Sequence, residues 1–156
     1  MPAKFTAALA EKLEQATGKR CREAREGDTL APGVMLVAPG GHHMRIARCP
    51  AGRMVHLDNI EPNQFCRPSA DFVFESAAAA FGPRVAGVVL SGMGVDGCEG
   101  SAKIAAAGGR VIVQDEASSL VWGMPGAVAQ AGHAEAVKPL KDLSSLALKM
   151  MNGEAA

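Results

Sequence analysis

The stretch 86–100, AGVVLSGMGVDGCEG, decides the fold class that we predict for this chain. Its first five residues are apolar or glycine, which is typical of a strand buried on both faces. The glycine-rich turn that follows opens a helix, which we expect to run through Ile104 to Ala107 and to end at Gly108. A second apolar run, Arg110–Gln114, predicts a second buried strand. Two such strands joined by a helix favour a parallel sheet covered by helices.

Periodicity and turn residues on either side extend this pattern. Apolar residues recur at helical spacing over 2–16, and Ser69 and Gly82 are placed to begin and end a second helix. Two β-like runs, 43–48 and 54–58, flank a short turn and predict an antiparallel hairpin, which we expect at one edge of the sheet. Further strands are expected at 21–24, 34–38 and 134–137, and further helices at 125–132 and 140–151.

Length and composition indicate a single folded domain over residues 1–156. Hydrophobic residues make up 48% and charged residues 21%, which are ordinary values for a folded chain. Sixteen basic residues balance sixteen acidic ones, so no net charge attracts nucleic acid or an anionic membrane. Four cysteines without a C-x-x-C pair argue against a disulfide framework or a zinc ribbon and favour a reducing cytoplasm. No signal peptide is recognised, and the longest uncharged run, 117–134, contains a proline and three glycines, so we expect no membrane insertion.

The glycine-rich turn has three competing interpretations. Gly92, Gly94 and Gly97 fit G-x-G-x-x-G, the spacing of a dinucleotide-binding turn. Such a turn binds pyrophosphate at the amides of a helix N-terminus, but Asp96 and Glu99 already place carboxylates there and would repel a phosphate. The second interpretation is that the turn presents Asp96 to orient a histidine, as the acid of a Ser-His-Asp hydrolase does. In the third, Asp96 is a helix cap and nothing more.

No complete triad can be assembled from these residues. The chain has four histidines, each better explained as a surface or packed residue than as a base: His42, His43, His56 and His133. Ser91 ends a strand, but Val89 breaks the G-x-S-x-G pattern of a nucleophile elbow. Ser118 and Ser119 lie in a loop without a defined partner.

Six longer motifs carry a resemblance to a known family. In chain order they are MPAKFTAALAEKL, LAPGVMLVAPGGHHM, RPSADFVFESAA, GVVLSGMGVDGCEG, GGRVIVQDEASSLVWGMPGAV and AGHAEAVKPL. From its first residue almost to its last, the chain resembles the catalytic domain of CheB-type protein-glutamate methylesterases of bacterial chemotaxis. Several motifs in the family's order are far more specific than one glycine pattern, so the resemblance argues against the dinucleotide interpretation.

The resemblance implies a three-layer α/β/α fold with a mostly parallel, doubly wound sheet. It also implies a cytoplasmic enzyme that hydrolyses glutamate methyl esters on chemoreceptor helices, often deamidates receptor glutamines, and uses no metal or organic cofactor. In the family's GMGxDG motif, the aspartate falls on Asp96 as the triad acid, and the methionine falls on Met93, whose backbone N–H suits an oxyanion hole. Arg67, Trp122 and Met124 are candidates to line the groove that holds the receptor, and packing against the sheet explains them equally well.

The chain also departs from the family pattern at its start. The resemblance places the catalytic histidine immediately before Met1 and the nucleophilic serine further upstream, so only the triad aspartate falls within residues 1–156. It likewise implies that the first strands of the family fold and a receiver domain are missing. We therefore expect the chain alone to be inactive and to expose an apolar sheet edge and face that favour self-association. The alternative function is a non-catalytic half-domain that binds receptor or a complementary fragment, and a third is a nucleotide-binding module.

Overall fold

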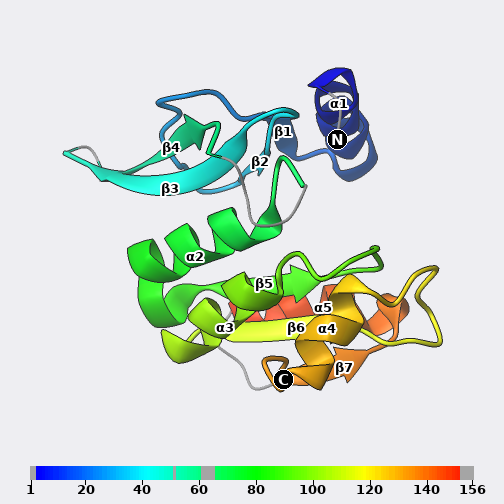
Figure 1. The fold of residues 1–156 in the computed structure, drawn as a ribbon. Coiled ribbons are helices and arrows are strands. Elements are labelled where there is room, and N and C mark those ends of the chain that lie inside the picture. Colours follow the sequence, from blue (N-terminus) through cyan, green and yellow to red (C-terminus); the bar gives the residue numbers. More distant parts are fainter. Residues whose placement is uncertain (1–2, 51, 61–65, 152–156) are drawn as a thin grey trace.

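The computed structural model describes residues 3–50, 52–60 and 66–151, and a three-stranded parallel sheet lies in the lower half of the molecule in Figure 1. Its first strand, β5 (Ala86–Val89), leads through the glycine-rich turn into α3 (Cys98–Ala106). β6 (Arg110–Gln114) then returns parallel to β5, and β7 (Ala136–Lys138) pairs in parallel with the far side of β6. The predicted parallel strands and the helix between them are confirmed.

Helices cover both faces of this sheet. α2 (Ala70–Phe81), α3 and α4 (Met124–Gln130) pack on one face, and α5 (Leu140–Met151) packs on the other; Figure 1 shows α3 and α4 in front of the sheet and α5 behind it. The molecule has two hydrophobic cores, one on each face of the sheet. Successive side chains of β6 point into one core and then the other, because side chains alternate between the faces of a strand. The larger core contains Ala78, Val89, Ile104, Val111, Val113 and Val128, and the smaller one contains Ile112, Leu143, Leu146 and Met150. The three-layer arrangement is confirmed.

The first half of the chain forms smaller units beside this core. β1 and β2 pair in parallel next to α1, whereas β3 and β4 form the predicted antiparallel hairpin. The loop after β1 also pairs with β4, between Thr29 and Met54, which joins the two units. The elements are α1 (Ala3–Thr17), β1 (Arg20–Glu23), β2 (Val34–Val37), β3 (His43–Cys49), β4 (Gly52–Asp58) and, after α2, the short 3-10 helix η1 (Gly82–Arg84).

The hairpin does not lie at one edge of the parallel sheet, so that part of the prediction is wrong. It forms a separate two-stranded sheet on the side of α2 that faces away from the core (Figure 1). The Ile46 N–H donates to the hydroxyl of Ser76 on α2 at 2.9 Å, and the Arg45 guanidinium lies 4.1 Å from the centre of the Phe72 ring. Because the hairpin packs on α2, it cannot extend the sheet that α2 covers.

β5 is also less buried than its apolar sequence predicts. Gly87 and Val89 are buried toward α2 and α3, but Val88 is 37% exposed and Leu90, just after the strand, is 47% exposed. α5 packs mainly against β6, and among the described residues no strand pairs with the outer edge of β5. The expected exposed apolar edge and face are therefore present at β5.

The helix boundaries agree closely with the residues that predict them. α2 has Ser69 at its N-cap and Gly82 after its last residue, and α1 ends just before Gly18, which has the positive φ of 64° that glycine adopts readily. Within 3–50, 52–60 and 66–151, the helices are all too short or too polar to cross a membrane.

Candidate active site

Two loops at the carboxyl ends of β5 and β6 form the candidate site, and backbone contacts hold them together. The Gly92 N–H donates to the Val121 carbonyl at 3.0 Å, and the Gly92 carbonyl accepts from Gly123 and Met124 at 3.1 and 2.8 Å. A Cβ atom on Gly92 would lie 2.5 Å from the Met124 sulfur, and one on Gly123 would lie 2.8 Å from the Gly92 oxygen. Gly92, the first glycine of the G-x-G-x-x-G pattern, thus allows the close contact between these loops because it has no side chain.

Asp96 precedes α3, but its carboxylate turns to the start of α2. The residue is only 7% exposed. Its Oδ1 accepts the Ser69 hydroxyl at 2.6 Å and the Asp71 N–H at 3.2 Å, and its Oδ2 accepts the Ala70 N–H at 2.8 Å. A carboxylate in this position satisfies helix N-terminal amides and interacts favourably with the helix dipole. Asp96 therefore caps α2, a helix that starts 26 residues earlier in the sequence.

Asp71, in the first turn of α2, makes the corresponding contact with α3. Its Oδ1 accepts the N–H of Gly100, in the first turn of α3, at 2.6 Å. Burial raises the pKa of Asp71, the Gly100 N–H opposes this change, and the nearby carboxylates of Asp96 and Glu99 raise it further. Each helix is thus capped by a carboxylate from the start of the other. A pyrophosphate would need amides at the start of α3, and one of these is already bound, which argues against the dinucleotide interpretation.

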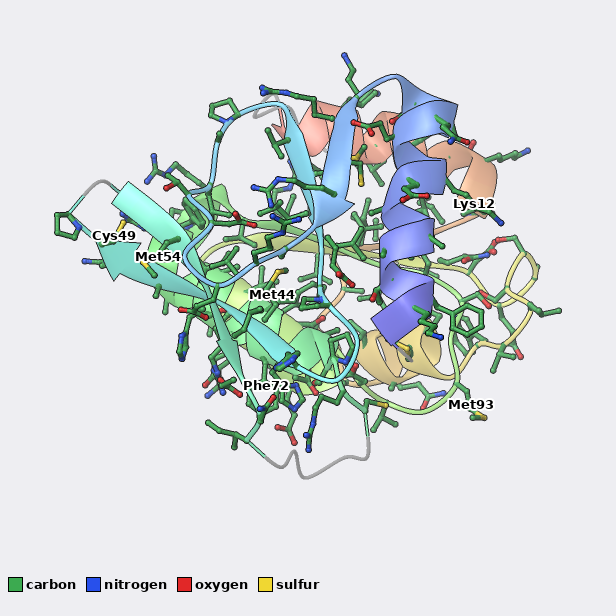
Figure 2. All side chains as sticks on the ribbon, turned by 90° about the horizontal axis from the view of Figure 1, so that it is seen from above. Lys12, Met44, Cys49, Met54, Phe72 and Met93 are labelled. Carbon is green, nitrogen blue, oxygen red and sulfur yellow. The ribbon has the colours of Figure 1, made fainter. Side chains whose placement is uncertain are left out.

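Met93 occupies the turn three residues before Asp96. Its side chain is 85% exposed, and Figure 2 shows it pointing away from the body of the molecule. Its backbone N–H makes no hydrogen bond with any residue that the structure describes. This amide is therefore available as an oxyanion donor, and that role stays a prediction.

The three residues predicted to line the receptor groove have different surroundings. Trp122 is half-buried and donates its indole N–H to the Gln114 carbonyl at 3.0 Å. Met124 packs against the larger core. Arg67 is half-buried in the segment that leads into α2. These contacts favour the packing explanation for Trp122 and Met124, and receptor contact by any of the three stays a prediction.

The serines near these loops stabilise the loops themselves. The Ser91 hydroxyl donates to the Val121 carbonyl at 3.2 Å and accepts the Val121 N–H at 3.0 Å. Ser118 and Ser119 donate to the side chain and the carbonyl of Asp115 at 2.6 and 2.7 Å. In the described part of the chain, no serine hydroxyl bonds to a histidine, and no histidine bonds to the Asp96 carboxylate. These residues do not form a nucleophile and base.

His43 is a fully buried histidine beside the candidate site. Its Nδ1 accepts the Ser69 N–H at 3.3 Å, and its ring stacks on Phe72 with the centroids 4.1 Å apart; Phe72 is labelled in Figure 2, where it overlaps the hairpin. Because Nδ1 accepts a hydrogen bond, the neutral ring carries its proton on Nε2. The prediction of a surface or packed residue is confirmed, and the sequence did not reveal that His43 supports Ser69.

Metal and thiol chemistry find no support in the residues that the structure describes. Within them, no group of three or more His, Cys, Asp or Glu side chains is arranged to hold a metal ion. All four cysteines are free. Burial raises the pKa of the Cys98 thiol, and its sulfur donates to the Ala127 carbonyl at 3.6 Å, so this thiol is kept in its unreactive form.

Comparison with known proteins identifies the fold and the family. The family model for CheB methylesterase matches residues 1–146. The chain belongs to the CheB methylesterase family. It also matches the crystal structure of the Thermotoga maritima CheB methylesterase catalytic domain with a TM-score of 0.92 at 31% identity, covering 96% of this chain and 79% of that one.

Curated relatives of this CheB-family chain carry a consistent name. A protein-glutamate methylesterase/protein-glutamine glutaminase 2 from Caulobacter vibrioides is 52% identical over 144 residues, which cover 92% of this chain and 42% of the relative. A protein-glutamate methylesterase/protein-glutamine glutaminase 1 from Rhodospirillum rubrum is 47% identical over 152 residues, covering 97% and 39%. The chain thus spans about two fifths of the length of these relatives.

An apolar rim lies beside the candidate site of this CheB-family chain, and two of its residues belong to the stretch 118–125, SSLVWGMP, which also contains the predicted groove residues Trp122 and Met124. Leu120 is 94% exposed and Val121 is 45% exposed in the loop after β6, and Val95 is 50% exposed beside Met93. The sequence signal for these residues is that large apolar side chains occur in the loops that follow the two apolar strands. Together they give the site an apolar surface of the kind that contacts other proteins.

Proposed function

We propose that residues 1–156 form the larger part of the catalytic domain of a protein-glutamate methylesterase that acts on chemoreceptor helices in the cytoplasm. The buried, fixed carboxylate of Asp96 in the GMGVDG turn carries this proposal. The Met93 N–H, which bonds to none of the residues that the structure describes, and the apolar rim agree with it, because they provide an oxyanion donor and a surface for a protein substrate.

In the proposed reaction, a serine hydroxyl attacks the methyl ester carbonyl and a histidine accepts its proton. The Met93 N–H stabilises the oxyanion, and the histidine returns the proton as methanol leaves. Water then hydrolyses the acyl-enzyme by the same route. Asp96 orients the histidine throughout. About a fifth of the Thermotoga catalytic domain has no counterpart in this chain, and we place the serine and histidine in that part.

Methanol release from methylated receptor tests this proposal. We would compare two proteins. One is residues 1–156 alone, and the other is a fusion in which the upstream part of the Caulobacter catalytic domain precedes residues 1–156. The intact Caulobacter relative is the positive control. The fusion should release methanol, and residues 1–156 alone should not. Asp96→Asn in the fusion should lower kcat by about 10⁴-fold, as for a triad acid whose histidine takes the wrong tautomer.

Three results of this assay would contradict the proposal. Turnover by residues 1–156 alone would refute the placement of the serine and histidine outside them. A folded fusion without activity beside an active positive control would refute the esterase function. An Asp96→Asn fusion with near-normal kcat would remove Asp96 from the mechanism.

A non-catalytic half-domain is the second candidate function, because the outer edge of β5 has no strand partner among the described residues and Val88 and Leu90 expose apolar side chains there. It predicts that residues 1–156 bind a complementary upstream fragment or receptor and that the fusion hydrolyses nothing.

A nucleotide-binding module instead predicts that NAD raises the Tm of residues 1–156. We expect no such increase, because Asp71 already occupies an amide at the start of α3.

A further inference from the structure

Asp96 has four acceptor positions, and its neighbours occupy three of them. A carboxylate offers about two lone pairs on each oxygen. Oδ1 accepts two hydrogen bonds, from the Ser69 hydroxyl and the Asp71 N–H, whereas Oδ2 accepts one, from Ala70. Oδ1 is therefore saturated, and the remaining acceptor position lies on Oδ2. With 7% of the residue exposed, little water can compete for that position.

Ser69 makes the shortest of these contacts, and its hydroxyl bonds to Asp96 instead of to an amide of α2. A serine at an N-cap ordinarily accepts a hydrogen bond from an amide of the first turn. Here the Ser69 side chain makes no such bond to α2, and its hydroxyl donates to Asp96 Oδ1 at 2.6 Å. The carboxylate then performs the capping, so the serine fixes the acid and the acid caps the helix.

The backbone of Ser69 is itself held in place. Its N–H donates to Nδ1 of His43, which is fully buried and stacked on Phe72. Ser69 is 5% exposed, so its side chain is not available for contact with a receptor. A chain of buried contacts thus runs from Phe72 through His43 and Ser69 to the carboxylate.

We propose that Ser69 is a positioning residue for catalysis, which locks Asp96 Oδ1 so that Oδ2 alone receives the N–H of the catalytic histidine. This inference rests on the proposed function, in which Asp96 orients that histidine. Without the Ser69 hydroxyl, Oδ1 keeps only the longer bond from the Asp71 N–H, so the carboxylate is held less firmly and orients the imidazole less well. Substrate binding is unaffected, because Ser69 makes no contact with the surface.

Two substitutions of buried serines on or before α2 form a matched test in the active fusion. Ser69→Ala should lower kcat about 10- to 100-fold with KM unchanged, the range typical when a residue that orients a metal ligand is lost. Ser76→Ala is the control, because Ser76 is also buried and, within the described residues, its hydroxyl bonds to the backbone of Ile46, Phe72 and Val73. We expect this control to lower stability and to leave kcat unchanged. Ser69→Thr keeps the hydroxyl and should recover most of the lost kcat.

A second measurement does not require activity. In residues 1–156, amide hydrogen exchange at Ala70 and Asp71 should become faster in Ser69→Ala, since both amides lose a fixed acceptor, and should stay slow in Ser76→Ala and Ser69→Thr. Unchanged exchange in Ser69→Ala would overturn the proposal, as would a kcat equal to that of Ser76→Ala. An inactive parent fusion would instead refute the proposed function, and the exchange result would still decide whether Ser69 holds the carboxylate.

Discussion

The imidazole of His43 lies between the Ser69 N–H and the ring of Phe72, and its ionisation depends on this environment. Burial lowers the pKa of His43; the Asp58 carboxylate opposes the change, and the guanidinium of Arg67 adds to it. Arg45 lowers the pKa further, whereas the Ile60 backbone raises it. A protonated ring also has no acceptor for the Ser69 N–H.

We therefore predict that acid weakens the fold through His43. The folded pKa is lower than the unfolded value of about 6.5, so the unfolded state binds more protons in the interval between them. The stabilisation is complete above about pH 6.5 and is lost as the pH falls toward the folded pKa. Urea unfolding at a series of pH values from 7.5 to 5 should show that the free energy of unfolding decreases as the pH is lowered. In His43→Gln the free energy of unfolding should change less over the same pH range.

His42→Gln is the control for His43→Gln, because His42 is the exposed neighbour of His43. If the two variants show the same slope of unfolding free energy against pH, His43 is not the group responsible.

At the level of elements, Gly100 sets how closely α2 and α3 approach. A Cβ atom there would lie 2.6 Å from the Phe74 Cβ and 2.9 Å from the Asp71 Cα. Alanine is ordinarily favoured over glycine inside a helix by about 1 kcal/mol. Here the added methyl should push the helices apart, and we predict that Gly100→Ala lowers the free energy of unfolding by about 1–3 kcal/mol, the usual cost of overpacking.

Urea unfolding of Gly100→Ala and of Ala105→Gly checks this prediction. Ala105 is exposed on the same helix, so its replacement measures helix propensity without packing. Ala105→Gly should cost about 0.5–1 kcal/mol. A Gly100→Ala protein more stable than the parent would show that this contact does not limit the approach of the two helices.

The elements and the place of the acid could be predicted from the sequence, but the partners of the acid could not. Local signals located Ser69 at the start of α2 and Asp96 between β5 and α3, because caps, apolar runs and glycines act over a few residues. Asp96 caps α2 and Asp71 caps α3 only because the two helices lie close together at Gly100. The Asp71–Gly100 hydrogen bond joins residues 29 positions apart in the sequence. The position of the hairpin could not be predicted for a similar reason, since its sequence predicts two strands and a turn but not the helix on which they pack.

For the whole molecule, the outer edge of β5 is the surface most open to another chain. Within the described residues this edge lacks a strand partner, and Val88 and Leu90 expose apolar side chains beside it. An unpaired strand with an apolar face tends to pair with another copy or with an added strand. We therefore predict that residues 1–156 self-associate, so that their weight-average mass rises above 16.0 kDa with increasing concentration in analytical ultracentrifugation.

Val88→Lys should shift residues 1–156 toward the monomer mass, because a charge on the sheet face opposes pairing at its edge. Leu120→Lys is the matched control: Leu120 is 94% exposed but lies in the loop after β6 and not on β5, and its replacement should leave association unchanged. The fusion that supplies the upstream segment should also be monomeric if that segment covers β5. A parent chain that remains monomeric at every concentration would show that the exposed edge is too short to pair. If Leu120→Lys alone abolished association, the contact between copies would lie at the apolar rim of the site and not at β5.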